Sequence, residues 1–260
     1  MRVISHHSVV DVFPSVTGSC LTHLEGSLSG RRHEADGLIG TDPDDGRPLL
    51  ARYDTRTARR TLTADSLRGR AWGGLWRWRE MLPVRDGAFV LHLGEGATPL
   101  IPSPRLGHAL GFENLLVKAE SLNPTGSFKA RGMAVAVSRA VELGATELVA
   151  PSAGNAAGAL AAYAAAAGAR ATVVMPADAP LANQQEVRVC GAELILVDGP
   201  LPAYEEDDDE TAELVLDDDV ETVRSEAARL TTQLEAAARR MAALEARRAA
   251  LIRRLEDSGR

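Results

Sequence analysis

The sequence of 260 residues contains only two cysteines, Cys20 and Cys190, and aromatic residues make up just 4% of it. Two cysteines cannot form the disulfide framework of a small secreted protein, so a reducing cytoplasm is the compartment that fits. No apolar run reaches the roughly 20 residues that a membrane-spanning helix needs. The first seven residues also lack the apolar centre of a signal peptide. The sequence therefore predicts a cytoplasmic protein without a membrane partner.

Basic residues are outnumbered by acidic ones, and the formal net charge is −7. The excess acid lies in residues 205–219, which hold ten acidic residues and no basic one. The rest of the chain has 26 acidic and 29 basic residues, so its charge predicts no nucleic-acid partner. Residues 55–92 carry arginines followed by all three tryptophans, a combination that can stack on nucleic acid. A helix and linker packed on the body of the protein is the better interpretation.

The most informative stretch is residues 123–132, which read Asn-Pro-Thr-Gly-Ser-Phe-Lys-Ala-Arg-Gly. Pro124 and Gly126 predict a tight turn, and Ser127 is a good helix cap. Lys129 then falls in the first turn of a helix, where the partial positive charge of the helix end favours a neutral amine. A neutral lysine beside unsatisfied N–H donors suits a Schiff base with an aldehyde cofactor that carries a phosphate. The alternative is a capped helix with a solvated lysine.

A second motif, Ser-Ala-Gly-Asn-Ala-Ala-Gly, covers residues 152–158 and follows the apolar run at 147–150. It opens an alanine-rich stretch that predicts a helix over residues 155–167. Small polar residues where a strand is followed by a helix leave N–H groups free to bind an anion. This motif therefore predicts a site for a substrate carboxylate.

Short β-branched runs alternate with helical patterns from residue 115 onward, and a glycine follows each helical pattern. The predicted strands cover residues 115–120, 148–150, 171–175 and 193–197. The predicted helices cover residues 127–143, 155–167 and 181–190. This alternation is typical of βαβ units and of an α/β fold with a parallel sheet. A nicotinamide-binding Rossmann domain is the rival fold, but residues 154–158 lack its G-x-G-x-x-G spacing.

Together, the motifs at residues 123–132 and 152–158 resemble those of the pyridoxal-phosphate enzymes of the tryptophan-synthase-β type. Two further motifs narrow the resemblance to threonine synthase: Gly-Leu-Trp-Arg-Trp-Arg at residues 74–79 and Leu-Gly-Glu-Gly-Ala-Thr-Pro-Leu at residues 93–100. The resemblance covers residues 24–199. It implies the parallel three-layer α/β sheet of that superfamily, in incomplete form, and pyridoxal 5'-phosphate as the cofactor.

The resemblance also assigns roles around the cofactor. Lys129 matches the lysine that forms the internal aldimine and later moves protons. Asn155 matches the asparagine that hydrogen-bonds the cofactor's ring hydroxyl, and Phe128 would flank the cofactor pocket.

For the substrate, the resemblance implies O-phosphohomoserine, which members of the family convert to threonine and phosphate. Ser152, Ala153 and Gly154 match the loop that receives the substrate carboxylate. Thr98 is a candidate contact for the substrate phosphate. The cofactor supplies the electron sink for this chemistry, while the protein supplies position and protonation states.

Residues 24–54 have the spacing of a zinc ribbon in which every cysteine is replaced. Gly26 and Ser29 occupy the first pair of positions, and Asp42 and Asp45 occupy the second. Gly26 offers no ligand atom, and carboxylates are harder donors than the thiolates of such sites. The sequence predicts a ribbon-like segment without a metal, between an unpatterned N-terminus at 1–23 and the helix and linker at 55–92.

The resemblance to threonine synthase covers a partial pyridoxal-phosphate domain at residues 93–199 and then stops. No Gly-Gly-Gly run that would match the family's loop for the cofactor phosphate follows Gly199. Cofactor affinity is therefore expected to fall, because charge-assisted hydrogen bonds to phosphate are strong. Residues 200–219 read as an acidic linker. Apolar residues alternate at spacings of four and three over 220–257, which predicts a coiled-coil-like helix and a homo-oligomer.

Three functions remain open from the sequence. The first is a threonine synthase-like enzyme that uses pyridoxal phosphate, favoured by the Gly-Glu-Gly motif and the ribbon remnant. The second is a threonine/serine dehydratase-like enzyme, since the same lysine and Ser-Ala-Gly-Asn loop serve both. The third is a catalytically inactive synthase fragment that self-associates through its C-terminal helix.

Overall fold

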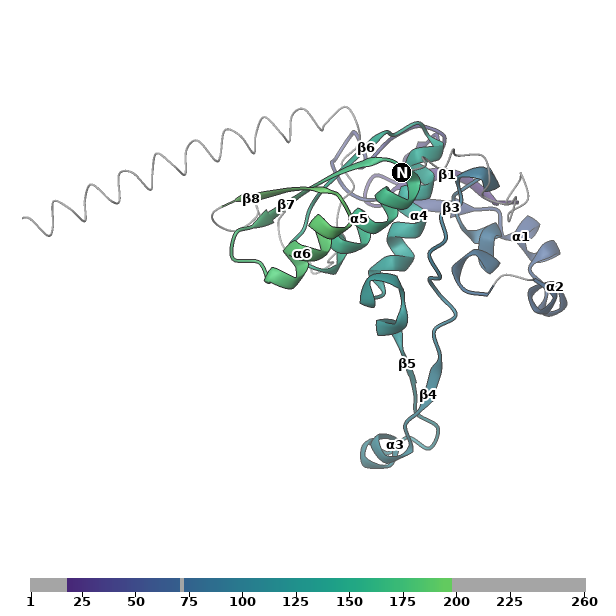
Figure 1. The fold of residues 1–260 in the computed structure, drawn as a ribbon. Helices are drawn as coiled ribbons and strands as arrows, with labels where there is room; N and C mark the ends of the chain where they lie inside the picture. The colour runs from purple at the N-terminus through teal and green to yellow at the C-terminus, as the bar shows by residue number, and fades with distance from the viewer. Residues whose placement is uncertain (1–17, 71–72, 198–260) are drawn as a thin grey trace, which may run out of the picture.

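The computed structural model describes residues 18–70 and 73–197 (Figure 1). The predicted acidic linker, the predicted coiled-coil-like helix and the first 17 residues lie outside these ranges. Across the described part of the chain, every helix is too short or too polar to cross a bilayer.

A parallel three-stranded sheet forms the centre of the fold, in the order β6-β7-β8. Its strands are β6 (Glu147–Pro151), β7 (Arg170–Pro176) and β8 (Glu193–Val197). Helices α5 (Asn155–Ala167) and α6 (Leu181–Val189) connect them, so the segment is two successive βαβ units. The predicted parallel sheet and its mixed α/β content are confirmed for these strands.

Helix α4 (Lys129–Glu142) packs along α5, and their interface forms much of the core (Figure 1). Alanines dominate the buried face of α5, and such small side chains allow two helices to approach closely. Leu148, Leu160, Tyr163 and Met175 are completely buried around this contact. The pairing of the two helices places the residues before α4 beside α5, which matters for the site.

The strand that precedes the Lys129 turn does not join the parallel sheet. β5 (Leu116–Lys118) pairs antiparallel with β4 (Leu100–Pro102), and α3 (Pro104–Leu110) connects them. The sequence predicted the strand but gave it the wrong neighbour. Strand β4, which ends 14 residues before β5 begins, takes the place of a more distant parallel partner.

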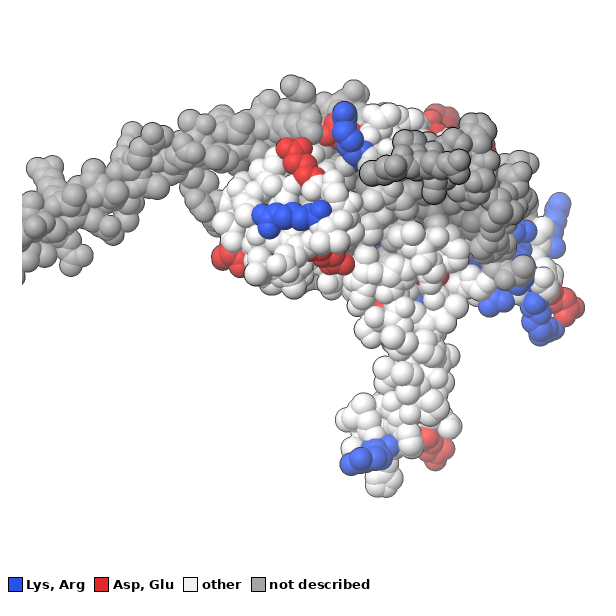
Figure 2. Space-filling model, in the orientation of Figure 1, with Lys and Arg blue, Asp and Glu red and all other residues white. Residues whose placement is uncertain are grey.

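We call residues 100–118 the arm, because β4, α3 and β5 project from the body (Figure 1). In the view of Figure 2 the arm is mostly white, with charged side chains gathered at its far end. Its exposed apolar side chains are Leu100, Ile101, Leu106, Leu110, Phe112, Leu116 and Val117.

The N-terminal part is a separate antiparallel sheet in the order β2-β1-β3. Its strands are β1 (Leu21–Gly26), β2 (Arg32–His33) and β3 (Leu49–Tyr53). Two short helices follow, α1 (Thr55–Thr61) and α2 (Ala64–Gly69), and then the 3-10 helices η1 (Leu75–Met81) and η2 (Gly87–Phe89). Trp76 of η1 is 3% exposed and belongs to the core, as expected for a segment packed on the body.

Candidate active site

Lys129 is the first residue of α4 and follows a turn built from two 3-10 segments, η3 (Glu120–Leu122) and η4 (Pro124–Gly126). The Lys129 amide donates a 3.3 Å hydrogen bond to the hydroxyl of Ser127. The N-cap of α4 is nevertheless Phe128, and no side chain caps the helix, so the predicted Ser127 cap is wrong. The Lys129 ammonium lies 4.9 Å from the centre of the Phe128 ring. Phe128 is 53% exposed and is thus available to flank a ligand.

Backbone strain is concentrated in two of the motifs. Among the described residues, Thr125 at φ 58° and Ala97 at φ 46° are the non-glycine residues with positive φ. A β-branched residue such as Thr125 rarely adopts this conformation, and the cost is about 1–3 kcal/mol. Such strain persists only where surrounding contacts impose it, and it gathers at functional sites.

The contacts that hold this turn centre on Glu120, which sequence reasoning did not single out. The Glu120 carboxylate accepts hydrogen bonds from Arg131 Nε at 2.7 Å and from Arg131 Nη2 at 2.8 Å. It also accepts from the Asn123 amide at 2.8 Å and from the Thr98 hydroxyl at 2.9 Å. The two-pronged bond from Arg131, aided by the other donors, lowers the pKa of Glu120 to about 2.

Thr98 lies inside this network rather than on an open surface. It is 7% exposed, and its hydroxyl accepts a 3.2 Å hydrogen bond from Arg131 while donating its single hydrogen to Glu120. A contact with a substrate phosphate would require that hydrogen to leave Glu120. The role of Thr98 as a phosphate contact stays a prediction.

The second loop, residues 152–155, connects β6 to α5. Gly154 is the N-cap of α5 and no side chain caps the helix, so its first N–H groups are available to an anion. The Gly154 amide donates to the Ser152 hydroxyl at 3.3 Å, and the Ala153 carbonyl accepts a 2.7 Å hydrogen bond from Asn183. Asn155 is exposed at the start of the helix.

The two loops come from neighbouring elements, because η4 and α4 both pack against α5. Asn155 follows a strand of the parallel sheet, as predicted. Lys129 instead follows a strand of the arm. The structure thus brings the Lys129 turn to α5 by helix packing, and not by a shared sheet edge.

The two motifs that narrowed the resemblance to threonine synthase touch each other. The amide of Leu75 donates to the carbonyl of Glu95 at 3.4 Å. A Cβ on Gly74 would lie 2.3 Å from that carbonyl oxygen, and a Cβ on Gly96 would lie 2.6 Å from the Cα of Gly74. Only glycine fits at either position, so the contact explains why both motifs contain one.

A model of the family described as "Pyridoxal-phosphate dependent enzyme" matches residues 91–247, which is more than half of the chain. This chain belongs to that family. Its curated relatives include the threonine synthase of Methanocaldococcus jannaschii, 39% identical over 171 residues that make up 65% of this chain and 42% of the relative. The threonine synthase of Synechocystis is 45% identical over 131 residues, 49% of this chain and 34% of the relative. The chain spans less than half the length of these relatives.

Among solved structures, a pyridoxal 5'-phosphate-dependent aspartate racemase is 35% identical, with a TM-score of 0.37 over 39% of this chain and 33% of that one. Members of this family are pyridoxal-phosphate dependent, so the cofactor named by the sequence is the family's cofactor.

The residues present fit the reactive part of that cofactor. The primary amine of Lys129 at the start of α4 can react with the cofactor's aldehyde. The exposed Phe128 ring beside it can contact the face of the cofactor ring, and the exposed Asn155 amide can bind the ring hydroxyl. The uncapped N–H groups of α5 suit a carboxylate or phosphate. Lys129, Phe128 and Asn155 would hold the cofactor, and Ser152, Ala153 and Gly154 would hold the substrate.

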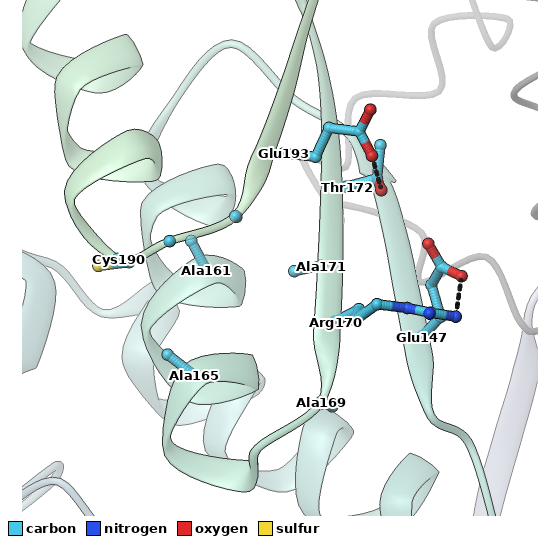
Figure 3. Close-up of a pocket in the computed structure, with 11 residues that line it drawn as sticks. Glu147, Ala161, Ala165, Ala169, Arg170, Ala171, Thr172, Cys190 and Glu193 are labelled. Atoms are coloured by element: carbon cyan, nitrogen blue, oxygen red, sulfur yellow. Dashed lines mark hydrogen bonds and ion pairs between the residues drawn. The ribbon is translucent and has the colours of Figure 1, made fainter.

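A hollow of about 240 Å³ lies at the other end of the parallel sheet (Figure 3). Glu147 and Arg170 begin strands β6 and β7 and form an ion pair of 2.9 Å at its edge, and α5 contributes alanines to its wall. The Ser152 loop follows the opposite end of β6. The hollow is therefore separate from the candidate active site.

In the ribbon-like segment, Asp42 stands at one of the four positions that cysteines occupy in a zinc ribbon, and its carboxylate is buried. Asp42 is 0% exposed and accepts hydrogen bonds from the Ser29 hydroxyl at 2.5 Å and the Asp44 amide at 3.0 Å. His33 Nε2 lies 3.4 Å from Asp42, and ligand atoms of His33, Asp42 and Asp44 lie within 4.8 Å of one another. Asp44 is also paired with Arg31. A segment without a metal stays our prediction, because Asp42 already accepts hydrogen bonds from Ser29 and from the Asp44 amide.

Proposed function

We propose that this chain is a threonine synthase-like enzyme that uses pyridoxal phosphate to convert O-phosphohomoserine and water into threonine and phosphate. The observation that carries the proposal is the strained Asn-Pro-Thr-Gly-Ser-Phe-Lys turn, which presents Lys129 at the start of α4 beside α5. The curated relatives that contain matching segments are named threonine synthases.

In this proposal, Lys129 binds the cofactor through its amine and then moves protons at the substrate. The N–H groups at the start of α5 and the Ser152 hydroxyl orient the substrate carboxylate. Asn155 orients the cofactor ring, and Phe128 excludes water from one side. The bound cofactor supplies an electron sink for the substrate's Cα.

The two lysines of the chain, Lys118 and Lys129, allow a direct test. The full chain is mixed with pyridoxal phosphate, the visible absorption is recorded, and the complex is reduced with borohydride and mapped by peptide mass. We expect the label on Lys129 and no visible band in Lys129→Ala. Lys118→Arg is the matched control, because Lys118 donates to the Thr98 carbonyl and arginine keeps a donor. A label on Lys118 alone, or no label, would overturn the proposal.

Product analysis then separates the candidate reactions. Release of phosphate and threonine from O-phosphohomoserine supports the synthase. Formation of a 2-oxo acid and ammonia from threonine or serine supports the dehydratase-like alternative. Cofactor binding without either reaction supports the inactive fragment.

We also propose that the protein is cytoplasmic, since both cysteines are unpaired thiols. A homo-oligomer formed through residues 220–257 remains a proposal about residues outside the described ranges. Sedimentation equilibrium of the full chain and of a version that ends at Gly199 tests it, and equal numbers of chains per particle would contradict it.

A further inference from the structure

The Glu120 carboxylate uses both oxygens fully. Oε1 accepts from Arg131 Nη2 and from the Thr98 hydroxyl, and Oε2 accepts from Arg131 Nε and the Asn123 amide. Two hydrogen bonds to each oxygen fill the four positions that an ionised carboxylate offers. A fully satisfied network of this kind fixes a single geometry.

Asn123 extends the network to a third segment of the chain. Its amide nitrogen donates to the Glu120 carbonyl at 2.9 Å as well as to the Glu120 carboxylate. Its amide oxygen accepts a 3.0 Å hydrogen bond from the amide of Gly96, 27 residues earlier in the chain. Asn123 is 5% exposed, so each of these groups would be costly to leave without a partner.

The position of Lys129 within this network is the central point. Asn123 begins the turn that precedes Lys129, and Arg131 lies two residues after Lys129 in the first turn of α4. Both are bonded to the same carboxylate. The intervening residues include Thr125, whose positive φ angle needs surrounding contacts to persist.

We propose that Glu120 is a positioning residue for Lys129: its carboxylate binds Asn123 and Arg131 on either side of the lysine and joins them to Gly96 and Thr98. The inference rests on the proposed function only for what Lys129 does. Glu120 itself transfers no proton, because all its acceptor positions are filled and Arg131 holds it ionised. It acts by keeping the turn in one conformation.

The test compares Glu120→Gln with Glu80→Gln in the full chain. Glu80 is the matched control because it makes the same two-pronged pair, with Arg70, and both side chains are less exposed than those of Glu120 and Arg131. Arg131→Lys is the second variant, which keeps the charge but not the planar fork. All three are checked for folding by circular dichroism.

The first readout is amide hydrogen exchange of the chain without cofactor. In Glu120→Gln we expect peptides over residues 94–100 and 120–131 to exchange at least tenfold faster, with peptides from α5 and β7 unchanged. Arg131→Lys should give a smaller increase in the same peptides. Glu80→Gln should leave residues 120–131 unchanged. Unchanged exchange in Glu120→Gln, or an increase that is equally large in the peptides from α5 and β7, would overturn the inference.

The second readout is the pyridoxal-phosphate concentration that half-saturates the visible band. We expect at least a tenfold increase in Glu120→Gln and less than a twofold change in Glu80→Gln. Equal values for the two variants would contradict a positioning role. If the unsubstituted chain shows no band, the proposed function fails, and the exchange experiment alone still decides whether Glu120 holds the turn.

Discussion

The phenol of Tyr163 donates a 2.6 Å hydrogen bond to the carboxylate of Glu95, and both side chains are completely buried. His92 Nδ1 and the Leu93 amide lie 3.0 Å from the same carboxylate. Burial alone would raise the pKa of Glu95, but the hydrogen bonds from Tyr163 and His92 outweigh it and lower the pKa. Burial and the nearby carboxylate raise the pKa of Tyr163. The pair joins α5 to the Gly-Glu-Gly motif of the candidate site.

Removing the hydroxyl in Tyr163→Phe should destabilise the fold. The substitution leaves a buried carboxylate with one donor fewer, which costs about 1–3 kcal/mol. The free energy of unfolding from urea denaturation measures this. The control is Tyr53→Phe, since the Tyr53 hydroxyl bonds to no other residue in the described ranges, and its effect should be within error. Equal effects of the two substitutions would contradict the prediction.

Glu120 should make the free energy of unfolding depend on pH in the acidic range. Its pKa is about 2 in the folded chain and near 4.5 when unperturbed, so its contribution is complete above pH 4.5 and disappears as pH falls toward 2. The difference in unfolding free energy between the parent and Glu120→Gln should be constant from pH 7 to about 5 and shrink below about 4.5. Urea unfolding of both chains across this range is the measurement. A difference that stays constant to pH 3 would show that the ion pair does not carry the effect.

Gly96→Ala should be much more damaging than Gly168→Ala. Both residues have positive φ, 84° and 69°, so both alanines meet a conformational cost of about 1–2 kcal/mol. Only at Gly96 would the new Cβ also strike backbone, 2.4 Å from the Leu75 nitrogen, whereas at Gly168 it meets open space. We expect Gly96→Ala to lose about 1–3 kcal/mol more in thermal or urea unfolding. Similar losses for the two would contradict the close packing of these segments.

The ribbon-like segment should not need a metal. Dialysis against a chelator is expected to leave the melting temperature unchanged, because Ser29 and the Asp44 amide already bind Asp42. Asp42→Asn should lower the melting temperature without any added metal, since the amide nitrogen that replaces one carboxylate oxygen cannot accept the hydrogen bond made to that oxygen. Added Zn²⁺ that raises the melting temperature of the parent but not of Asp42→Asn would contradict this prediction.

Local patterns predicted the elements of the parallel sheet well. The limits of α5 and β8 agree with the structure to the residue, because glycines flank the alanine-rich run of α5 directly and the apolar run of β8 lies between Gly191 and Gly199. The same patterns correctly located the Lys129 turn and the loop at 152–155.

Long-range partners were not predictable from spacing. Nothing near Glu120 in the sequence indicates that its carboxylate pairs with Arg131 and bonds to Thr98, 22 residues earlier. The antiparallel partner of β5 was missed for the same reason, since a strand's own sequence does not specify which strand it meets. The Glu120 hydrogen bonds and the β4–β5 pairing depend on which segments the turns bring together, and a single sequence does not specify this.

The contact between Gly74 and Gly96 also restricts how this protein can change over evolutionary time. Each glycine leaves the space that the other segment's backbone fills, so a side chain at one position cannot be accommodated by shrinking the other. A single substitution at either position is therefore not tolerated, and a second substitution at the other position cannot compensate for it. Descendants that keep this fold should retain the two glycines together, and a lineage that loses one should rebuild the loop between them.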